Sequence, residues 1–241
     1  MEPPKHQSLS FVSWNTMGIR YTKGTNSKLQ LVLDELIRLK ADVVFLQETH
    51  IEPRSYEVPE SIKGWRTFFT VHHPRSKGVA ILIKNEKTFN YICHDEDYSG
   101  GYIVLFCHLY GQLYTLVNVY NHKADRQMLY RLRDYLTAIN TKGVLVVGGD
   151  FQLVLDELIR LKADVVFLQE THIEPRSYEV LESIKGWRTF FTVHHPRSKG
   201  VAILIKNEKT WLVGTSTQYW TQLLIGDQQQ IKRSIPHLDA F

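Results

Sequence analysis

A long internal repeat constrains the fold of this chain more than any other sequence feature. Residues 30–88 recur as residues 152–210, and 58 of the 59 aligned residues are identical. The single difference is Pro59 in the first copy and Leu181 in the second. Solenoid repeats are short, contiguous and divergent, so this chain is not a solenoid. Near-identical blocks separated by unrelated sequence indicate a recent copying event, and an error in gene assembly would leave the same pattern.

The repeat creates a physical conflict, because identical segments prefer identical neighbours. Copy one (residues 30–88) follows SFVSWNTMGIRYTKGTNSKL, whereas copy two (residues 152–210) follows VLVVGGDF. The two copies cannot both occupy the same position in one sheet. We therefore divide the chain into an amino-terminal part (1–151), copy two (152–210) and a polar tail (211–241) to which the pattern assigns no role.

Hydrophobic patterning in the amino-terminal part predicts an α/β protein. Residues 9–14 read as a buried strand, residues 31–40 have apolar residues close to a helical period, and VVFLQ (43–47) is typical of a buried strand. A strand–helix–strand opening is typical of the α/β class. The pattern also predicts a helix at 128–139 and strands at 64–71, 78–84, 100–107, 113–120 and 143–151.

Composition excludes several other classes of protein. No apolar run is long enough for a membrane span, and the first residues lack the apolar core of a signal peptide. Cys93 and Cys107 are too few for a disulfide framework and have no zinc-site spacing. The net charge of +4 is compatible with a nucleic-acid partner. We expect a nuclear or cytoplasmic protein without membrane contact or an obligate protein partner.

Polar side chains follow four of the apolar strands. They are Asn15 after FVSW, Glu48 after VVFLQ, Tyr120 after TLVNV and Asp150 after VLVVGG. Singly, Asn15 could cap a turn, Glu48 could be an exposed loop acid, and Asp150 could be a turn residue or helix N-cap. Together they place oxygen ligands where α/β proteins form sites, and a hard cation such as Mg²⁺ prefers such ligands.

The strings SFVSWNTMGI, ADVVFLQETH, SKGVAILI, LYTLVNVY and VLVVGGDF carry a family resemblance in this order. They resemble the metal-dependent endonuclease/exonuclease/phosphatase superfamily, and within it the apurinic-site endonuclease and exonuclease III branch. The sequence looks most like the endonuclease region of a LINE-type retrotransposon polyprotein, over about residues 9–151. The resemblance implies a four-layer α/β sandwich of two packed sheets with a site at their shared edge. The second half is incomplete and is replaced by the duplicated segment.

The resemblance also implies hydrolysis of DNA phosphodiesters with Mg²⁺ or Mn²⁺. By position, Glu48 is the principal metal ligand and Asn15 assists it, while Tyr120 lies near the scissile phosphate. Asp150 contributes to the metal site and orients or deprotonates the attacking water. Gln152 stands where the family's GD-x-N motif has asparagine, and we expect it near the metal as well.

Past the junction at residue 151, the family's Asp-bearing strand and terminal Ser-Asp-His motif are missing. His237 and Asp239 occur in reversed order in IPHLDA, and we do not expect them to substitute. The sequence therefore predicts an impaired nuclease. The alternatives are a non-catalytic DNA-binding remnant of a retroelement and a phosphatase acting on a small phosphoester. Glu170 is the copy of Glu48. It is either a ligand of a second metal ion or a copied residue without a role.

Basic residues near the predicted site are candidates for contacts with the nucleic-acid backbone. Arg20 and Lys23 follow Asn15 closely, and Arg75 and Lys77 belong to the loop HHPRSKG. A solvated hairpin tip would account equally well for the basic loop.

Overall fold

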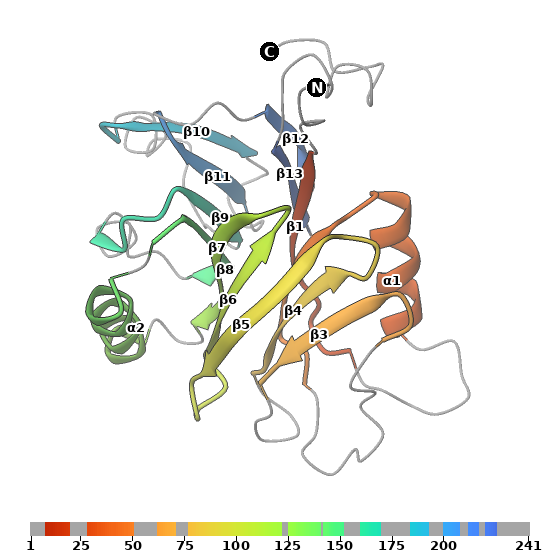
Figure 1. Ribbon diagram of the computed structural model, residues 1–241, viewed down its shortest axis with the longest axis horizontal. Helices are drawn as coiled ribbons and strands as arrows, with labels where there is room; N and C mark the ends of the chain where they lie inside the picture. Colours follow the sequence, from red (N-terminus) through yellow and green to blue (C-terminus); the bar gives the residue numbers. More distant parts are fainter. Residues whose placement is uncertain are drawn as a thin grey trace.

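The computed structural model shows two β-sheets packed face to face, with helices on their outer sides (Figure 1). It describes residues 8–19, 28–50, 62–70, 77–121, 125–140, 142–151, 160–169, 184–192, 200–207, 212–216 and 220–225.

Sheet A contains six strands in the order β12-β13-β1-β2-β4-β3. Its strands are β1 (Leu9–Asn15), β2 (Val43–Gln47), β3 (Trp65–Phe69), β4 (Val79–Lys84), β12 (Leu212–Ser216) and β13 (Trp220–Ile225). Strands β1 and β2 are parallel and are connected through helix α1 (Lys28–Arg38). This is the predicted strand–helix–strand opening.

Sheet B contains seven strands in the order β10-β11-β9-β8-β7-β6-β5. Its strands are β5 (Phe89–Glu96), β6 (Tyr102–Leu109), β7 (Gln112–Asn121), β8 (Val144–Phe151), β9 (Val165–Gln169), β10 (Trp187–Thr192) and β11 (Val201–Lys206). Strands β7, β8 and β9 run parallel, and helix α2 (Arg126–Ala138) connects β7 to β8. The Asp125 carboxylate caps α2 by accepting a hydrogen bond from the Met128 amide at 3.1 Å.

The two copies of the repeat take equivalent places in different sheets. Copy one forms the order β2-β4-β3 in sheet A, and copy two forms β9-β11-β10 in sheet B. The pairing of Val43 with Ile83 recurs between the duplicated residues Val165 and Ile205. The conflict predicted from the repeat is thus resolved, because each copy has its own sheet.

The strands preceding each copy are equivalent in the same way. β1 lies parallel to β2 with Asn15 opposite Gln47, and β8 lies parallel to β9 with Asp150 opposite Gln169. Asn15 and Asp150 therefore occupy matching positions at the ends of two related strand pairs. The unrelated sequences before the two copies supply the same structural element, a parallel strand on the same side.

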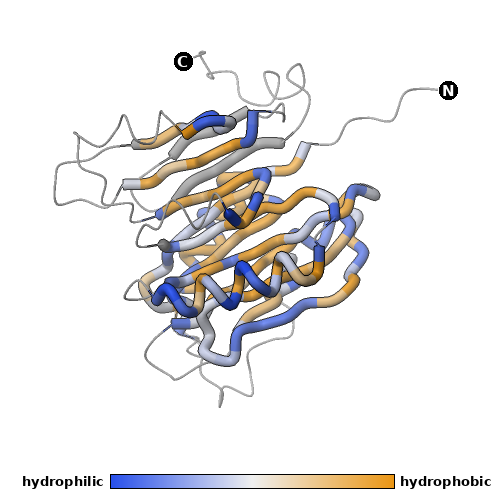
Figure 2. The backbone as a smooth tube through the Cα atoms, turned by 90° about the vertical axis from the view of Figure 1, so that its left-hand side faces the viewer, coloured by the Kyte–Doolittle hydropathy of each residue, from blue (hydrophilic) through white to orange (hydrophobic). Residues whose placement is uncertain are grey.

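Apolar side chains fill three layers. The cluster between the sheets contains Phe11, Phe45 and Phe167, with the Phe45 and Phe167 ring centroids 6.1 Å apart. The outer faces are covered by α1 on sheet A and α2 on sheet B. In Figure 2 hydrophobic residues concentrate on the interior strands, whereas α2 alternates between hydrophilic and hydrophobic residues. This is the predicted four-layer α/β sandwich.

Two features of the fold were not predicted. Strand β5 forms the edge of sheet B, and its side chains are mostly exposed, so no buried apolar pattern marks it. The tail contributes the hairpin β12–β13, which extends sheet A next to β1. Within the described residues, no helix has the length and apolar character needed to cross a membrane.

Candidate active site at the carboxyl edge of the two sheets

The parallel strands of both sheets end at a common edge. β1 and β2 end at this edge in sheet A, and β7, β8 and β9 end there in sheet B. The sheets are stacked so that β1 packs against β8 and β9. Polar residues that follow five different strands therefore converge at one place, as strand ends of α/β proteins commonly do.

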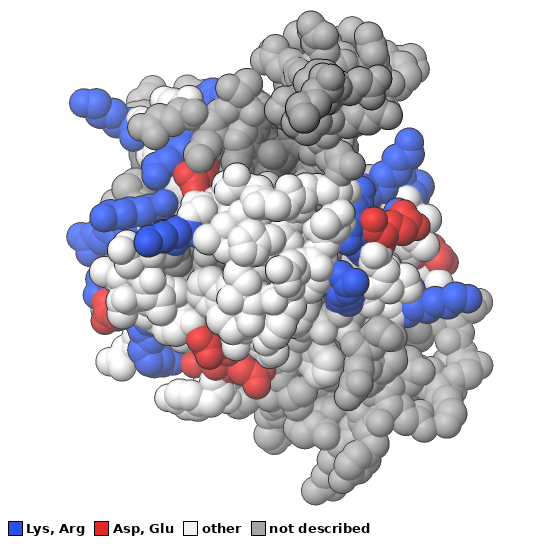
Figure 3. Space-filling view, in the orientation of Figure 1, with Lys and Arg blue, Asp and Glu red and all other residues white. Residues whose placement is uncertain are grey.

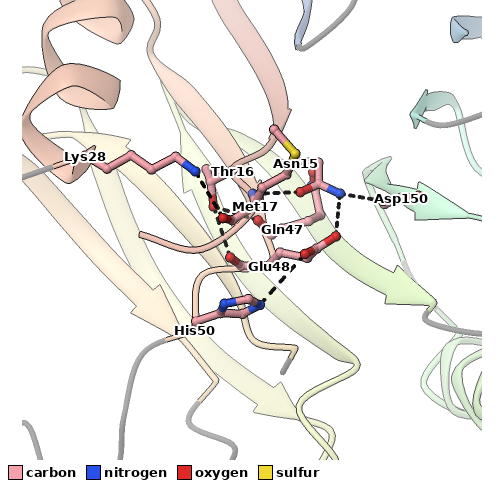
Figure 4. Close-up of polar contacts among 8 residues, drawn as sticks. All are labelled: Asn15, Thr16, Met17, Lys28, Gln47, Glu48, His50 and Asp150. Carbon is pink, nitrogen blue, oxygen red and sulfur yellow. Dashed lines mark hydrogen bonds and ion pairs between the residues drawn. The ribbon is translucent and has the colours of Figure 1, made fainter. Parts of the chain in front are cut away.

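Asn15 links the two predicted acidic residues (Figure 4). Its side-chain Nδ2 donates to Glu48 Oε1 at 2.8 Å and to Asp150 Oδ2 at 2.6 Å. Its Oδ1 accepts a hydrogen bond from the Met17 amide at 3.0 Å. These contacts fix the amide orientation, because the reverse orientation would place oxygen against both carboxylates. Because both carboxylate oxygens bind the same nitrogen atom, Glu48 and Asp150 lie close to each other.

Burial differs between the two carboxylates. Asp150 is 5% exposed and Asn15 is 6% exposed, whereas the Glu48 side chain is 21% exposed. His50 Nε2 lies 3.8 Å from Glu48 Oε2 on the solvent side. A ligand reaching the site from solvent would therefore meet Glu48 and His50 first, with Asp150 behind them.

The loops after β1 and β2 hold Glu48 in an unusual backbone conformation. Met17, Glu48 and His50 have φ angles of 47°, 51° and 52°, in the left-handed region that side-chain-bearing residues rarely adopt. The loops are tied together because the Gly18 amide donates to the Glu48 carbonyl at 2.7 Å. Such strained conformations persist where the surrounding structure enforces them and are common at functional sites.

Copy two contributes a side chain to the site that the sequence did not reveal. Gln169 Oε1 accepts a hydrogen bond from the backbone amide of Asn15 at 2.5 Å, and its Nε2 donates to Ser13 Oγ at 3.3 Å. Gln169 is 2% exposed. It fixes the end of β1 at the residue that bridges the two carboxylates. The signal for it was a single amide at the end of the otherwise apolar run VVFLQ.

Its duplicate, Gln47, also binds Ser13 but has a different second partner. Gln47 Nε2 donates to Ser13 Oγ at 3.3 Å and to Asn118 Oδ1 at 2.7 Å. Asn118 in turn donates to the carbonyls of Leu46 and Ala80 at 2.8 Å and 2.7 Å. This buried amide network lies directly behind the carboxylates and connects sheet A to sheet B.

Tyr120 and Asn121 complete the edge at the end of β7. Tyr120 lies opposite Asp150 in the sheet register and is 8% exposed. The next residue, Asn121, is 2% exposed. Its two side-chain polar atoms have no hydrogen-bond partner within the described parts of the chain. Side chains alternate along β7, and Asn121 lies opposite Phe151 in the register, so it points to the other face of sheet B from Tyr120 and Asp150 and is not part of the carboxylate site.

The remaining predicted site residues divide into two groups. Lys77 lies beside the Glu48 loop, where its carbonyl accepts a hydrogen bond from the His50 amide at 3.1 Å. The others, Arg20, Lys23, Arg75 and Gln152, lie outside the described residues, as do Glu170, the copy of Glu48, and His237 and Asp239, which were not expected at the site.

The donor set suits a hard divalent cation with few protein ligands. Among the described residues, no three His, Cys, Asp or Glu side chains form a group that could hold a metal ion. The ligands available are two carboxylates, which the Asn15 amide holds together, so water or substrate would complete the coordination. Mg²⁺ is commonly bound in this way, by one or two carboxylates and several waters. A transition-metal site rich in histidine or cysteine does not fit these residues.

Comparison with known proteins identifies relatives of this fold. The sequence profile of the Endonuclease/Exonuclease/phosphatase family matches residues 12–151. The structure is similar to a 3'-5' exonuclease, NExo, from Neisseria meningitidis, with 14% identity and a TM-score of 0.52, over 91% of this chain and 99% of that chain. It is also similar to TDP2 from D. rerio complexed with a single-strand DNA product, with 14% identity and a TM-score of 0.50, over 91% and 98% of the two chains.

A weaker likeness is to the endonuclease domain of TRAS1, a telomere-specific non-LTR retrotransposon. The identity is 12% and the TM-score 0.48, over 91% of this chain and 98% of that domain. The comparison of the sequence with curated proteins gave no match.

Proposed function

This chain belongs to the Endonuclease/Exonuclease/phosphatase family, and from that premise we propose that it hydrolyses phosphodiester bonds of DNA with a divalent metal ion. The observation that carries the proposal is the contact of one amide, Asn15 Nδ2, with both Glu48 and Asp150 at 2.8 Å and 2.6 Å. Two carboxylates held this closely repel each other unless a cation or a proton lies between them. The fold relatives support a nucleic-acid substrate, because one is a 3'-5' exonuclease and the other was solved with a DNA product.

In this proposal Glu48 and Asp150 hold Mg²⁺ or Mn²⁺, and Asn15 keeps them in place. The cation would neutralise charge on the phosphate oxygens and favour attack by water. Asp150 is the candidate base that orients the water and accepts its proton. His50, 3.8 Å from Glu48, supplies a further positive group when it is protonated. Gln152 remains a predicted ligand outside the described residues.

The substrate would approach along the exposed side of Glu48. Tyr120 lies near the end of β7, opposite Asp150 in the register. Its hydroxyl is the candidate donor of a hydrogen bond to a phosphate oxygen. Lys77 belongs to the loop next to Glu48, and we propose that it contacts the DNA backbone together with Arg20, Lys23 and Arg75.

We expect turnover well below that of an intact family member. The family's terminal Asp-His motif has no counterpart in the sequence. Removing one of several catalytic groups that act together typically lowers turnover by several orders of magnitude. Gln169 lies at the carboxyl-terminal end of β9 and both donates and accepts hydrogen bonds. An amide, however, cannot take part in proton transfer as histidine does. The same deficit supports the second candidate function, a DNA-binding remnant without cleavage.

A plasmid-nicking assay with Mg²⁺ tests the proposal, and the duplication provides a matched control. Glu48→Ala removes the carboxylate at the described site, and Glu170→Ala makes the same substitution in the same local sequence of copy two. We expect slow nicking by the unaltered chain and by Glu170→Ala, and none by Glu48→Ala or in EDTA. Nicking by Glu48→Ala at the unaltered rate would refute the assigned site.

Two further results separate the alternatives. Folded protein that binds DNA in a salt-sensitive manner without nicking it would support the remnant. Hydrolysis of p-nitrophenyl phosphate in preference to DNA would support a phosphatase. Turnover equal to that of an intact relative would contradict the expected impairment.

A further inference from the structure

A polar cavity lies at the opposite end of sheet B from the carboxylates. It has a volume of about 330 Å³ and lies between the carboxyl-terminal end of α2 and the beginnings of β8 and β9. Leu145 and Asp164 line it, whereas Asp150 and Gln169 lie at the other ends of the same two strands. Five residues of strand separate Leu145 from Asp150, or roughly 16 Å. A ligand here would not contact the proposed metal site directly.

The cavity is lined by an excess of positive charge. Among the described residues, Arg133, Arg160, Lys162 and Lys206 line it, with Asp164 as the single acidic residue, and Arg133 also pairs with Asp134 at 2.8 Å. Asp164 Oδ2 already accepts a hydrogen bond from the Leu145 amide at 2.9 Å, so part of its capacity is used by the protein. Figure 3 shows Lys and Arg side chains gathered along the left-hand side, where α2 and β9 lie in Figure 1.

Neutral donors supplement these charges. Thr137 and Asn140, at the end of α2, line the same cavity and supply a hydroxyl and an amide. Guanidinium, ammonium, hydroxyl and amide donors around one hollow suit the several acceptor oxygens of a phosphate group. The partial negative charge at the end of α2 attracts the nearby cations but repels an anion, so phosphate binding would depend on the arginine and lysine side chains.

The duplication allows the basic residues of the cavity to be compared with identical residues in copy one. Arg160, Lys162 and Lys206 are copies of Arg38, Lys40 and Lys84. In copy one Arg38 binds Glu35 at 2.5 Å, and Lys84 lies 3.5 Å from Glu86. In copy two the corresponding side chains line the cavity together with residues of α2, which belongs to the unique sequence between the copies. This wall depends on the place of copy two in sheet B.

We propose that this cavity is an anion site that binds a phosphate group, at the opposite end of β8 and β9 from the proposed metal site. The phosphate would belong either to the backbone of a bound nucleic acid or to a free phosphate compound. Both sources offer the same chemistry to the cavity. The proposal does not depend on catalysis, because binding is measured without a divalent metal.

The test compares two charge-matched double variants of the full chain. Lys162→Gln with Lys206→Gln alters the cavity, and Lys40→Gln with Lys84→Gln makes the same changes in copy one. Each pair removes the same charge from the same local sequence, so both change long-range electrostatics alike. Binding of inorganic pyrophosphate and of a short fluorescein-labelled single-stranded DNA is measured in EDTA. Thermal midpoints verify that all proteins are folded.

We expect the cavity variant to bind at least one of the two probes about tenfold more weakly, and the copy-one variant to change binding about twofold or less. A selective loss for DNA identifies backbone phosphate as the ligand, and a selective loss for pyrophosphate identifies a free phosphate compound. Equal weakening by both variants, or no binding of either probe by the unaltered chain, would overturn the proposal. Loss of nicking in Glu48→Ala would leave this result unaffected.

Discussion

Asn15 connects residues that come from three parts of the chain. Its side chain donates to Glu48 of copy one and Asp150 of β8, and its backbone donates to Gln169 of copy two. A donor shared by two carboxylates stabilises both charges, and hydrogen bonds to charged groups are stronger than neutral ones. Replacing this residue should therefore disturb the site more than its small size suggests.

Changing Asn15 to aspartate should make the stability of the protein depend on metal. The substitution replaces the shared donor with a third carboxylate, so we expect a loss of about 2–3 kcal/mol in EDTA. Mg²⁺ should restore much of the loss, because a cation relieves the repulsion. Urea unfolding with and without Mg²⁺ measures the effect. Asn90→Asp, at an exposed position on β5, is the control and should show no such dependence.

The two cysteines should differ strongly in reactivity. Cys107 is fully buried between the sheets, and burial raises the pKa of its thiol to about 12, whereas Cys93 is exposed. A raised pKa keeps the Cys107 thiol protonated and unreactive at about pH 8, where an ordinary thiol is partly ionised.

Ellman's reagent should therefore label one thiol quickly in the native protein and the second only on unfolding. Cys93→Ser should remove the fast phase. Two equally fast thiols would show that β6 is not packed as described.

At the scale of elements, β8 packs closely against β2 across the two sheets. Gly148 lies on β8 at the position that matches Ser13 on β1, and a Cβ atom there would meet the Phe45 ring at 2.7 Å. The close approach explains the glycine in VLVVGGD, which lies within the predicted strand 143–151. Strand β8 in fact continues through it to Phe151.

Gly148→Ala should consequently destabilise the protein by about 1–3 kcal/mol, because the added methyl overpacks the space between the sheets. The free energy of urea unfolding measures this loss. Gly111, at the β6–β7 turn, has a φ of 80°, and a Cβ atom added there would meet nothing within 4 Å. Gly111→Asn is the control and should cost less, since asparagine tolerates this conformation. A larger loss at Gly111 would contradict the described packing.

For the whole molecule, the central question is whether copy two is part of one cooperative fold. Phe45 and Phe167 are copies of the same residue, both fully buried, and their rings pack against each other. One comes from sheet A and the other from sheet B. The core between the sheets thus consists partly of the repeat packed against itself.

Phe45→Ala and Phe167→Ala should each cost about 3–5 kcal/mol, through the cavity left in the same core. The losses should not add in the double variant, because the two residues are in contact. Calorimetry should show one transition for the unaltered chain and for both single variants. An unchanged midpoint for Phe167→Ala, or a separate transition for copy two, would show that copy two is a passenger outside the cooperative fold.

Local sequence was sufficient to predict the types of most elements and to mark the polar residues at the strand ends. Strand and helix periods are local properties, so β1, α1, β2 and α2 were predictable close to their observed bounds. Glu48, Asn15 and Asp150 were identifiable because polar residues stand out at the ends of apolar runs. Exposed β5 and the β12–β13 hairpin in the tail lacked such a contrast and were missed.

The places of the two copies, by contrast, depend on tertiary packing. Identical segments carry identical local preferences, so nothing within them assigns one to sheet A and the other to sheet B. The choice comes from their neighbours, because copy one pairs with β1 and copy two with β8. Both glutamines bind Ser13, but their other partners differ: Gln47 binds Asn118, and Gln169 reaches Asn15 across the sheets. Contacts between residues far apart in the chain are a property of packing, which the periodicity of a sequence does not encode.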